Sequence, residues 1–173
     1  MMASFLPFIQ DILPMFMPSS ISVTRAKDIL PPPPPQPPLP TEEGGEALSG
    51  VRVLSRDAVI NKTDKMCASV LIVKPKSSST VRHNGEQDAI IYAASGTGVL
   101  LSSPNDEGEE EPPKRYELAQ GDFAFVPCWT EHQIVNESAD TDLLWVFTRS
   151  GPQPVEVNLM DWGGAEAKAP VNR

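Results

Sequence analysis

From residue 50 onward, the chain alternates short apolar runs with residues that form turns. The runs are rich in β-branched and aromatic residues, and Gly, Pro, Asn, Asp and Ser separate them. Because the apolar positions do not repeat with a helical period, this pattern predicts closely spaced strands. The predicted strands are residues 51–54, 68–73, 89–94, 99–102, 115–118, 123–126, 133–135, 143–147 and 155–157. We expect an all-β barrel or sandwich, because closing a sheet removes the exposed edges through which it would aggregate.

The N-terminal part of the chain has a different composition. Residues 31–40 contain eight prolines, which favour extended polyproline II geometry and cannot join a sheet. We interpret this tract as a linker, with a ligand for an SH3 or WW domain as the alternative. The expected organisation is an extension over residues 1–46, a barrel domain over 47–160 and a C-terminal tail over 161–173.

The apolar segment at residues 1–17 does not fit a membrane span or a secretory signal. Pro7 and Pro14 interrupt it, Asp11 lies in its middle, and no positive charge precedes Arg25. A signal peptide needs a basic start, and a membrane helix needs about 20 apolar residues. Three interpretations are left open for this segment. It is an interaction peptide, a short amphipathic segment, or a stretch added by an upstream start codon in the gene model. We expect a cytoplasmic protein without a membrane partner.

Charge and cysteine content narrow the classes of partner. The formal net charge of −9 argues against nucleic acid and anionic lipid as partners. The acidic run at 106–111 is interpreted as a solvated loop. Cys67 and Cys128 have neither disulfide nor zinc spacing, which is typical of a reducing compartment and of small buried roles.

One motif, in residues 121–136, carries most of the functional information. Gly121 begins a turn before a short apolar run, Pro127 ends the run, and His132 and Asn136 follow at fixed spacing. This spacing resembles the second signature motif of the cupin family, a family of small antiparallel barrels. The turn glycine that the family carries two positions after the proline is replaced by Trp129.

Residues 82–98 resemble the first cupin motif in part. The end of this stretch runs into a Gly-x-Gly turn, as in the family. At its start, Arg82 and Asn84 occupy the positions of the two family histidines, and Ala89 occupies that of the glutamate. His83 falls between them. The string His-Asn-Gly-Glu-Gln-Asp is similar to one found in small cupins common in fungal genomes, with Asn84 in place of their second histidine.

The resemblance implies a jelly-roll barrel whose inward side chains converge on a common lumen. The chain has two histidines, His83 and His132, and both lie in the cupin motifs. The ligands implied for a divalent transition metal (Fe, Mn, Ni, Cu or Zn) are His83, Gln87 and His132. Glu86 is the substitute carboxylate. Structural, hydrogen-bonded histidines without a metal are the alternative.

The resemblance also implies a small-molecule substrate and two classes of function. In the first, the protein is a metal-assisted, dioxygenase-like oxidoreductase acting on a phenolic or carbonyl metabolite of secondary metabolism. His132 and Arg82 are then the catalytic candidates, with the guanidinium clamping a carboxylate or enolate. An outward-facing arginine in a salt bridge is the alternative for Arg82. The alternatives are a metal-free isomerase or cyclase that uses His132, and a non-catalytic binding protein.

Aromatic and amide side chains complete the predicted lumen. Tyr92, Trp129 and Gln133 are the predicted substrate-binding residues. Trp145 and Phe147 are further candidates for the wall, with core packing as the alternative for every aromatic residue. Cupins often pair through their outer strands, so the resemblance also implies a homodimer.

Overall fold

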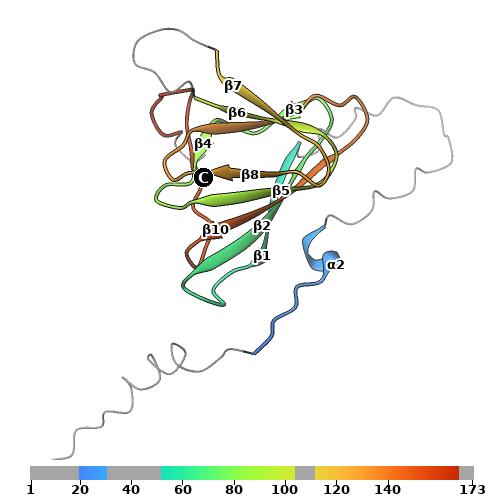
Figure 1. The fold of residues 1–173 in the computed structure, drawn as a ribbon, viewed down its shortest axis with the longest axis vertical. Coiled ribbons are helices and arrows are strands. Elements are labelled where there is room, and N and C mark those ends of the chain that lie inside the picture. The colour runs from blue at the N-terminus through green and yellow to red at the C-terminus, as the bar shows by residue number, and fades with distance from the viewer. Residues whose placement is uncertain (1–19, 31–51, 104–111, 168–173) are drawn as a thin grey trace, which may run out of the picture.

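The computed structural model describes residues 20–30, 52–103 and 112–167. In these residues the chain forms two antiparallel sheets that enclose one apolar core (Figure 1). The first sheet has the order β1 (Val53–Val59), β2 (Met66–Val73), β10 (Leu143–Ser150), β5 (Ala89–Ser95) and β8 (Phe123–Val126). The second has the order β11 (Val157–Asn158), β4 (Arg82–His83), β9 (His132–Asn136), β6 (Gly98–Ser102) and β7 (Lys114–Leu118), and β3 (Ser77–Ser78) also pairs with β9.

The all-β jelly-roll prediction is confirmed. Each predicted strand overlaps an observed one, and β8 has the predicted bounds. The prediction missed β3 and β4, which are too short to show an alternating pattern. It also ended β10 at residue 147, whereas the strand continues to Ser150. The proline tract, the first apolar segment and the acidic run lie outside the described residues.

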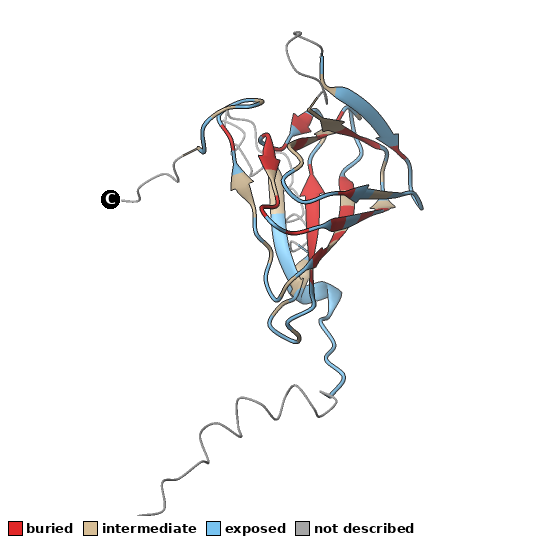
Figure 2. Cartoon of the chain, turned by 60° about the vertical axis from the view of Figure 1, so that its left-hand side comes forward, coloured by how far each residue is buried: buried red, intermediate tan, exposed pale blue. Residues whose placement is uncertain are grey.

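Alternation along the strands separates the core from the surface (Figure 2). On β10, the buried positions are Leu143, Trp145, Phe147 and Arg149. Trp145 and Phe147 therefore pack in the core, which was the alternative interpretation for these two residues. The row ends on a charged residue, so one end of the interior is apolar and the other is polar.

Two glycines hold the turns that the motifs predicted. Gly96, between β5 and β6, has a φ of +77°, and a Cβ there would lie 2.7 Å from the carbonyl oxygen of Asp142. Gly121, before β8, has a φ of +99°. These conformations are easily reached only by glycine. The first turn joins β5 to β6, and the second leads from β7 into β8.

A short described segment precedes the barrel. It contains α2 (Ala26–Ile29), which buries none of its own residues. The Thr24 hydroxyl donates to the carbonyl oxygen of Ala58, at the end of β1, and this contact is exposed. No helix in the described ranges is long and apolar enough to cross a membrane.

Candidate functional site

A cluster of polar side chains is buried at the polar end of the interior. Arg149 is 1% exposed and follows Trp145 and Phe147 in the inward row of β10. Its guanidinium donates to Ser69 Oγ at 2.7 Å and to Asn84 Oδ1 at 3.3 Å. Burial lowers the pKa of Arg149, but a guanidinium stays protonated in proteins. The polar end of the lumen is therefore positively charged.

Glu156 is the carboxylate that two arginines share. Its Oε1 accepts from Arg149 Nη2 at 2.7 Å, and its Oε2 accepts from Arg82 Nη1 at 2.9 Å. Arg82 comes from β4 and is also buried. Burial lowers the pKa of Arg82, and the neighbouring Glu156 acts in the opposite direction. With two guanidiniums on one carboxylate, the cluster has one positive charge in excess.

Several donors in this cluster have no hydrogen-bond partner. They are Nε and Nη2 of Arg82 and Nδ2 of Asn84. In the described part of the chain, the other buried side-chain nitrogens without a partner are His132 Nε2 and Trp145 Nε1. Buried polar groups are nearly always paired, and an unpaired one costs about 1–3 kcal/mol. Their concentration in one part of the interior therefore indicates a place for a further hydrogen-bonding group.

His132 lies next to Arg82, its cross-strand partner between β9 and β4. The ring is fully buried, and Nδ1 lies 3.0 Å from the carbonyl oxygen of Thr130. Because a carbonyl oxygen only accepts, Nδ1 carries the proton and Nε2 has a free lone pair. Burial, with a smaller effect of the nearby arginines, lowers the pKa of His132 to about 4. The imidazole is therefore neutral at pH 7.

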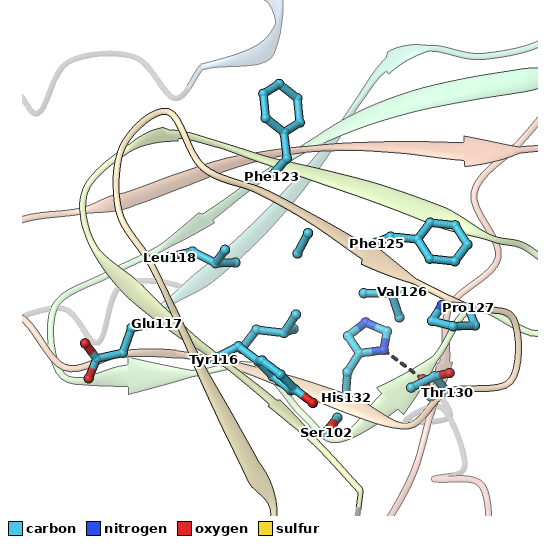
Figure 3. A pocket seen from close by; sticks show the side chains of 12 residues that line it. Ser102, Tyr116, Glu117, Leu118, Phe123, Phe125, Val126, Pro127, Thr130 and His132 are labelled. Carbon is cyan, nitrogen blue, oxygen red and sulfur yellow. Dashed lines mark hydrogen bonds between the residues drawn. The ribbon is translucent and has the colours of Figure 1, made fainter.

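A pocket of about 660 Å³ opens between the edge strands β7 and β8, and His132 forms part of its wall (Figure 3). A volume of this order fits a small organic molecule. The apolar part of its lining comprises Leu100, Tyr116, Leu118, Ala124, Val126 and Pro127. Ser102 and Thr130 are polar neighbours of His132 in the lining, which also includes the exposed Glu117. Phe123 and Phe125 also line the pocket, at its rim, and their rings are exposed (Figure 3).

The structure does not bring the predicted metal ligands together. His83 follows Arg82 on β4, so its side chain points to the face opposite Arg82 and His132. Its Nδ1 accepts the backbone N–H of Gly85 at 3.0 Å. Glu86, the substitute carboxylate, is exposed.

Gln87 is also engaged elsewhere. Its Nε2 donates to the carbonyl oxygens of Ser150 and Gln153, and its Oε1 accepts the N–H of Val155 at 2.7 Å. The side chain thus fixes the segment after β10 and has no free oxygen directed at His132. Hydrogen bonding to the backbone, which sequence patterns do not reveal, explains why the predicted ligand set is not assembled.

The donor set around His132 does not fit a transition metal. Arg82 and Asn84 stand where the family carries histidines; a guanidinium has no lone pair to donate, and the Asn84 oxygen already accepts from Arg149. Ala89 supplies no ligand atom. Across residues 20–30, 52–103 and 112–167, no three His, Cys, Asp or Glu side chains are grouped as a metal site.

None of the three predicted substrate-binding residues lines the pocket. Tyr92 is on the outer face of β5, where its ring packs on Phe123 with the centroids 4.7 Å apart. Gln133 follows His132 on β9 and faces the opposite way, with its Nε2 donating to the carbonyl oxygen of Ser79 at 2.8 Å. Trp129 is 60% exposed. The expectation that these three face the lumen fails, because strand alternation places Tyr92 and Gln133 outside.

Trp129 occupies the family's glycine position in a glycine-like conformation. Its φ is +61°, and its ring lies against His83 with the centroids 5.3 Å apart. We expect Trp129→Gly to be more stable than Trp129→Ala by about 1 kcal/mol, because both lose the ring contact and only alanine keeps the left-handed strain. Urea unfolding of the two variants is the measurement. Equal stability would contradict the assigned backbone conformation.

The residues of the buried polar cluster that the sequence analysis missed are Arg149, Ser69 and Glu156. Arg149 had a usable signal, because it continues the alternate positions of the apolar row on β10. Ser69 faces it from β2 in the same sheet. Glu156 had no signal, since it lies outside the strands and its contact with Arg82 spans 74 positions of sequence. The two cysteines also differ: Cys67 is buried, as expected, with its pKa raised by burial, whereas Cys128 is exposed.

Comparison with known families agrees with this architecture. Residues 69–148 match the model of the family described as Cupin domain. Over these residues the chain is similar to a cupin domain, and its fold is the all-β jelly roll of that family. The matched cupin segment contains the predicted motifs and His132, and it ends one position before Arg149. No match is found among curated protein sequences.

Solved structures share the cupin fold at low sequence identity. An uncharacterized Klebsiella pneumoniae protein with a double-stranded β-helix domain has a TM-score of 0.52 and 12% identity, over 71% of this chain and 90% of that one. An oxalate decarboxylase of Lactobacillus farciminis has a TM-score of 0.53 and 13% identity, over 62% of this chain and 32% of that one. A vicilin of Solanum melongena has a TM-score of 0.52 and 16% identity, over 62% of this chain and 30% of that one. The chain thus spans less than a third of the last two, and these likenesses show the fold alone.

Proposed function

We propose that this cupin domain binds a small organic molecule in the pocket between β7 and β8, and that His132 Nε2 accepts a hydrogen bond from a hydroxyl of that ligand. The observation that carries the proposal is the unpaired Nε2 of a buried, neutral histidine in the wall of a pocket with apolar surroundings. A lone pair in such a place is satisfied by a ligand donor. The apolar lining suits the hydrocarbon part of the ligand, such as an aromatic ring.

The proposal does not include a metal. The oxidoreductase interpretation depended on an ion held by His83, Gln87 and His132, and these side chains are engaged separately. Arg82 next to His132 adds a positive charge where a cation would have to sit.

Binding is favoured over proton transfer by the state of His132. A general base works best when its pKa lies near the working pH, whereas burial holds the pKa of His132 at about 4. The neutral ring is a good hydrogen-bond acceptor and a weak base. The metal-free isomerase or cyclase interpretation is thus the second candidate, supported by the same nitrogen.

Two neutral compounds that differ by one hydroxyl test the proposal. We expect the protein to bind 3-hydroxybenzamide several-fold more tightly than benzamide, because one net hydrogen bond contributes about 0.5–1.5 kcal/mol. The variant His132→Asn keeps a donor for the Thr130 carbonyl oxygen and removes Nε2, so it should bind both compounds equally. Isothermal titration calorimetry measures all four affinities.

A pocket-filling variant locates the binding. Ala124 lines the pocket from β8, and Ala124→Phe should abolish binding of both compounds while the far-UV circular dichroism stays that of the wild type. Unchanged affinity in this variant would refute the pocket. Conversion of either compound by the wild type but not by His132→Asn would favour the catalytic candidate over the binding one.

A further inference from the structure

We propose that the pocket ligand is a hydroxy acid whose carboxylate binds the unpaired donors of Arg82 and Asn84. The inference rests on the proposed binding function and adds the chemical class of the ligand. The hydroxyl faces His132 Nε2, and the acid group meets the arginine cluster, which is defined as Ser69, Arg82, Asn84, Arg149 and Glu156. Nothing in the fold alone requires this cluster, since an apolar interior would complete the core equally well.

The geometry of the unpaired atoms matches a carboxylate. Nε and Nη2 of Arg82 lack partners, whereas Nη1 is bonded to Glu156. These two nitrogens form one edge of the guanidinium, and their parallel N–H bonds match the two oxygens of a carboxylate. Nδ2 of Asn84, two positions along the same face, is a third unpaired donor. Donors of this kind are satisfied by a group that only accepts.

The charge of the cluster points to the same ligand. The two buried guanidiniums share Glu156 as their carboxylate partner. His132 does not add negative charge and is neutral at pH 7. An uncompensated buried charge is strongly unfavourable. One carboxylate would bring the cluster to neutrality, whereas a dianion would exceed it.

The two parts of the ligand site are adjacent. Arg82 and His132 are cross-strand partners, and such partners have Cα atoms about 4.5–5.5 Å apart. His132 lines the pocket, whereas Arg82 does not. A ligand that enters from the pocket therefore meets His132 first and reaches Arg82 past its ring. A hydroxyl and a carboxylate on neighbouring parts of one small molecule satisfy both side chains.

Comparing the affinities for an acid and for its amide tests this inference. We expect 3-hydroxybenzoate to bind at least about tenfold more tightly than 3-hydroxybenzamide, since hydrogen bonds to a charged group are the stronger kind. Arg82→Lys keeps the positive charge beside Glu156 and removes the Nε and Nη2 edge. It should lose most of the preference for the acid. Calorimetry at fixed ionic strength gives the affinities of both proteins.

Asn84→Asp is the sharper variant. It keeps an oxygen for Arg149 Nε, removes the unpaired Nδ2 and supplies the missing negative charge within the chain. We expect a higher melting temperature than that of the wild type and no preference for the acid. The matched control is Asn136→Asp, at a position that is also 1% exposed. There Nδ2 donates to two backbone carbonyl oxygens, so a carboxylate should lower the melting temperature.

The outcomes separate the inference from the proposed function. Equal binding of 3-hydroxybenzoate and 3-hydroxybenzamide would overturn the inference and leave the pocket function standing. If neither compound binds but acetate raises the melting temperature of the wild type and not of Asn84→Asp, the cluster binds a free carboxylate and the pocket function fails. A lower melting temperature for Asn84→Asp, or no response to any of these anions, would also overturn the inference.

Discussion

Replacing Glu156 with alanine should destabilise the domain by about 3–5 kcal/mol, the cost typical of removing one partner from a buried ion pair. The Glu156 side chain is 24% exposed, but it bonds both Arg82 and Arg149, which are 4% and 1% exposed. Without it, two guanidiniums face each other across the lumen with no negative charge between them. Urea unfolding at pH 7 should therefore show a much lower midpoint with a similar slope.

Glu137 provides the matched control for this prediction. It also forms two hydrogen bonds with an arginine, at 3.0 and 3.1 Å from Arg115, but both side chains are on the surface. Surface ion pairs contribute little because water screens them. Glu137→Ala should therefore leave the unfolding midpoint nearly unchanged. Equal effects of the two substitutions would contradict the buried cluster.

The stability of the domain should fall in acid because of His132. Its pKa is 6.5 in an exposed chain and about 4 in the fold, where burial disfavours the charged ring. Between these values the unfolded chain takes up a proton that the folded protein does not, so stability is lost as the pH falls from 6.5 to 4. The expected loss from this group is about 3 kcal/mol.

His132→Asn isolates that contribution. The charges of Arg82, Arg149 and Glu156 act on the ring, and these three residues are present in both proteins. From pH 7 to pH 4, the free energy of unfolding should fall by about 3 kcal/mol more in the wild type than in the variant. The same pH dependence in both proteins would mean that the ring is protonated in the fold or open to water.

The strands could be predicted from sequence because each leaves a local pattern. Residues 123–126 form β8 as predicted, since an apolar run between Gly121 and Pro127 fixes both ends. Side-chain direction was harder to predict. Within β4, a strand of two residues, periodicity does not say whether Arg82 or His83 faces inward. The burial of Arg82 is decided by its pairing with β9 and by Glu156.

The roles that candidate site residues take depend on contacts between distant parts of the chain. Gln87 has the residue type of a metal ligand, but it is occupied by backbone groups of the segment after β10. His132 was identified correctly as an interior residue, because its motif fixes its strand. The state of its ring depends on the Thr130 carbonyl oxygen and on burial, which only the folded chain reveals.

The central claim is that His132 presents an unprotonated Nε2 to an organic ligand. The chain has two histidines, so a long-range ¹H–¹⁵N NMR spectrum of the imidazoles resolves each ring, and His132→Asn assigns them. At pH 7 the account predicts a neutral His132 with the proton on Nδ1, and a shift of its Nε2 resonance when 3-hydroxybenzoate is added. Three results would contradict it: a proton on Nε2, a resonance that moves only when a metal ion is added or chelated, or no response to the ligand at saturation.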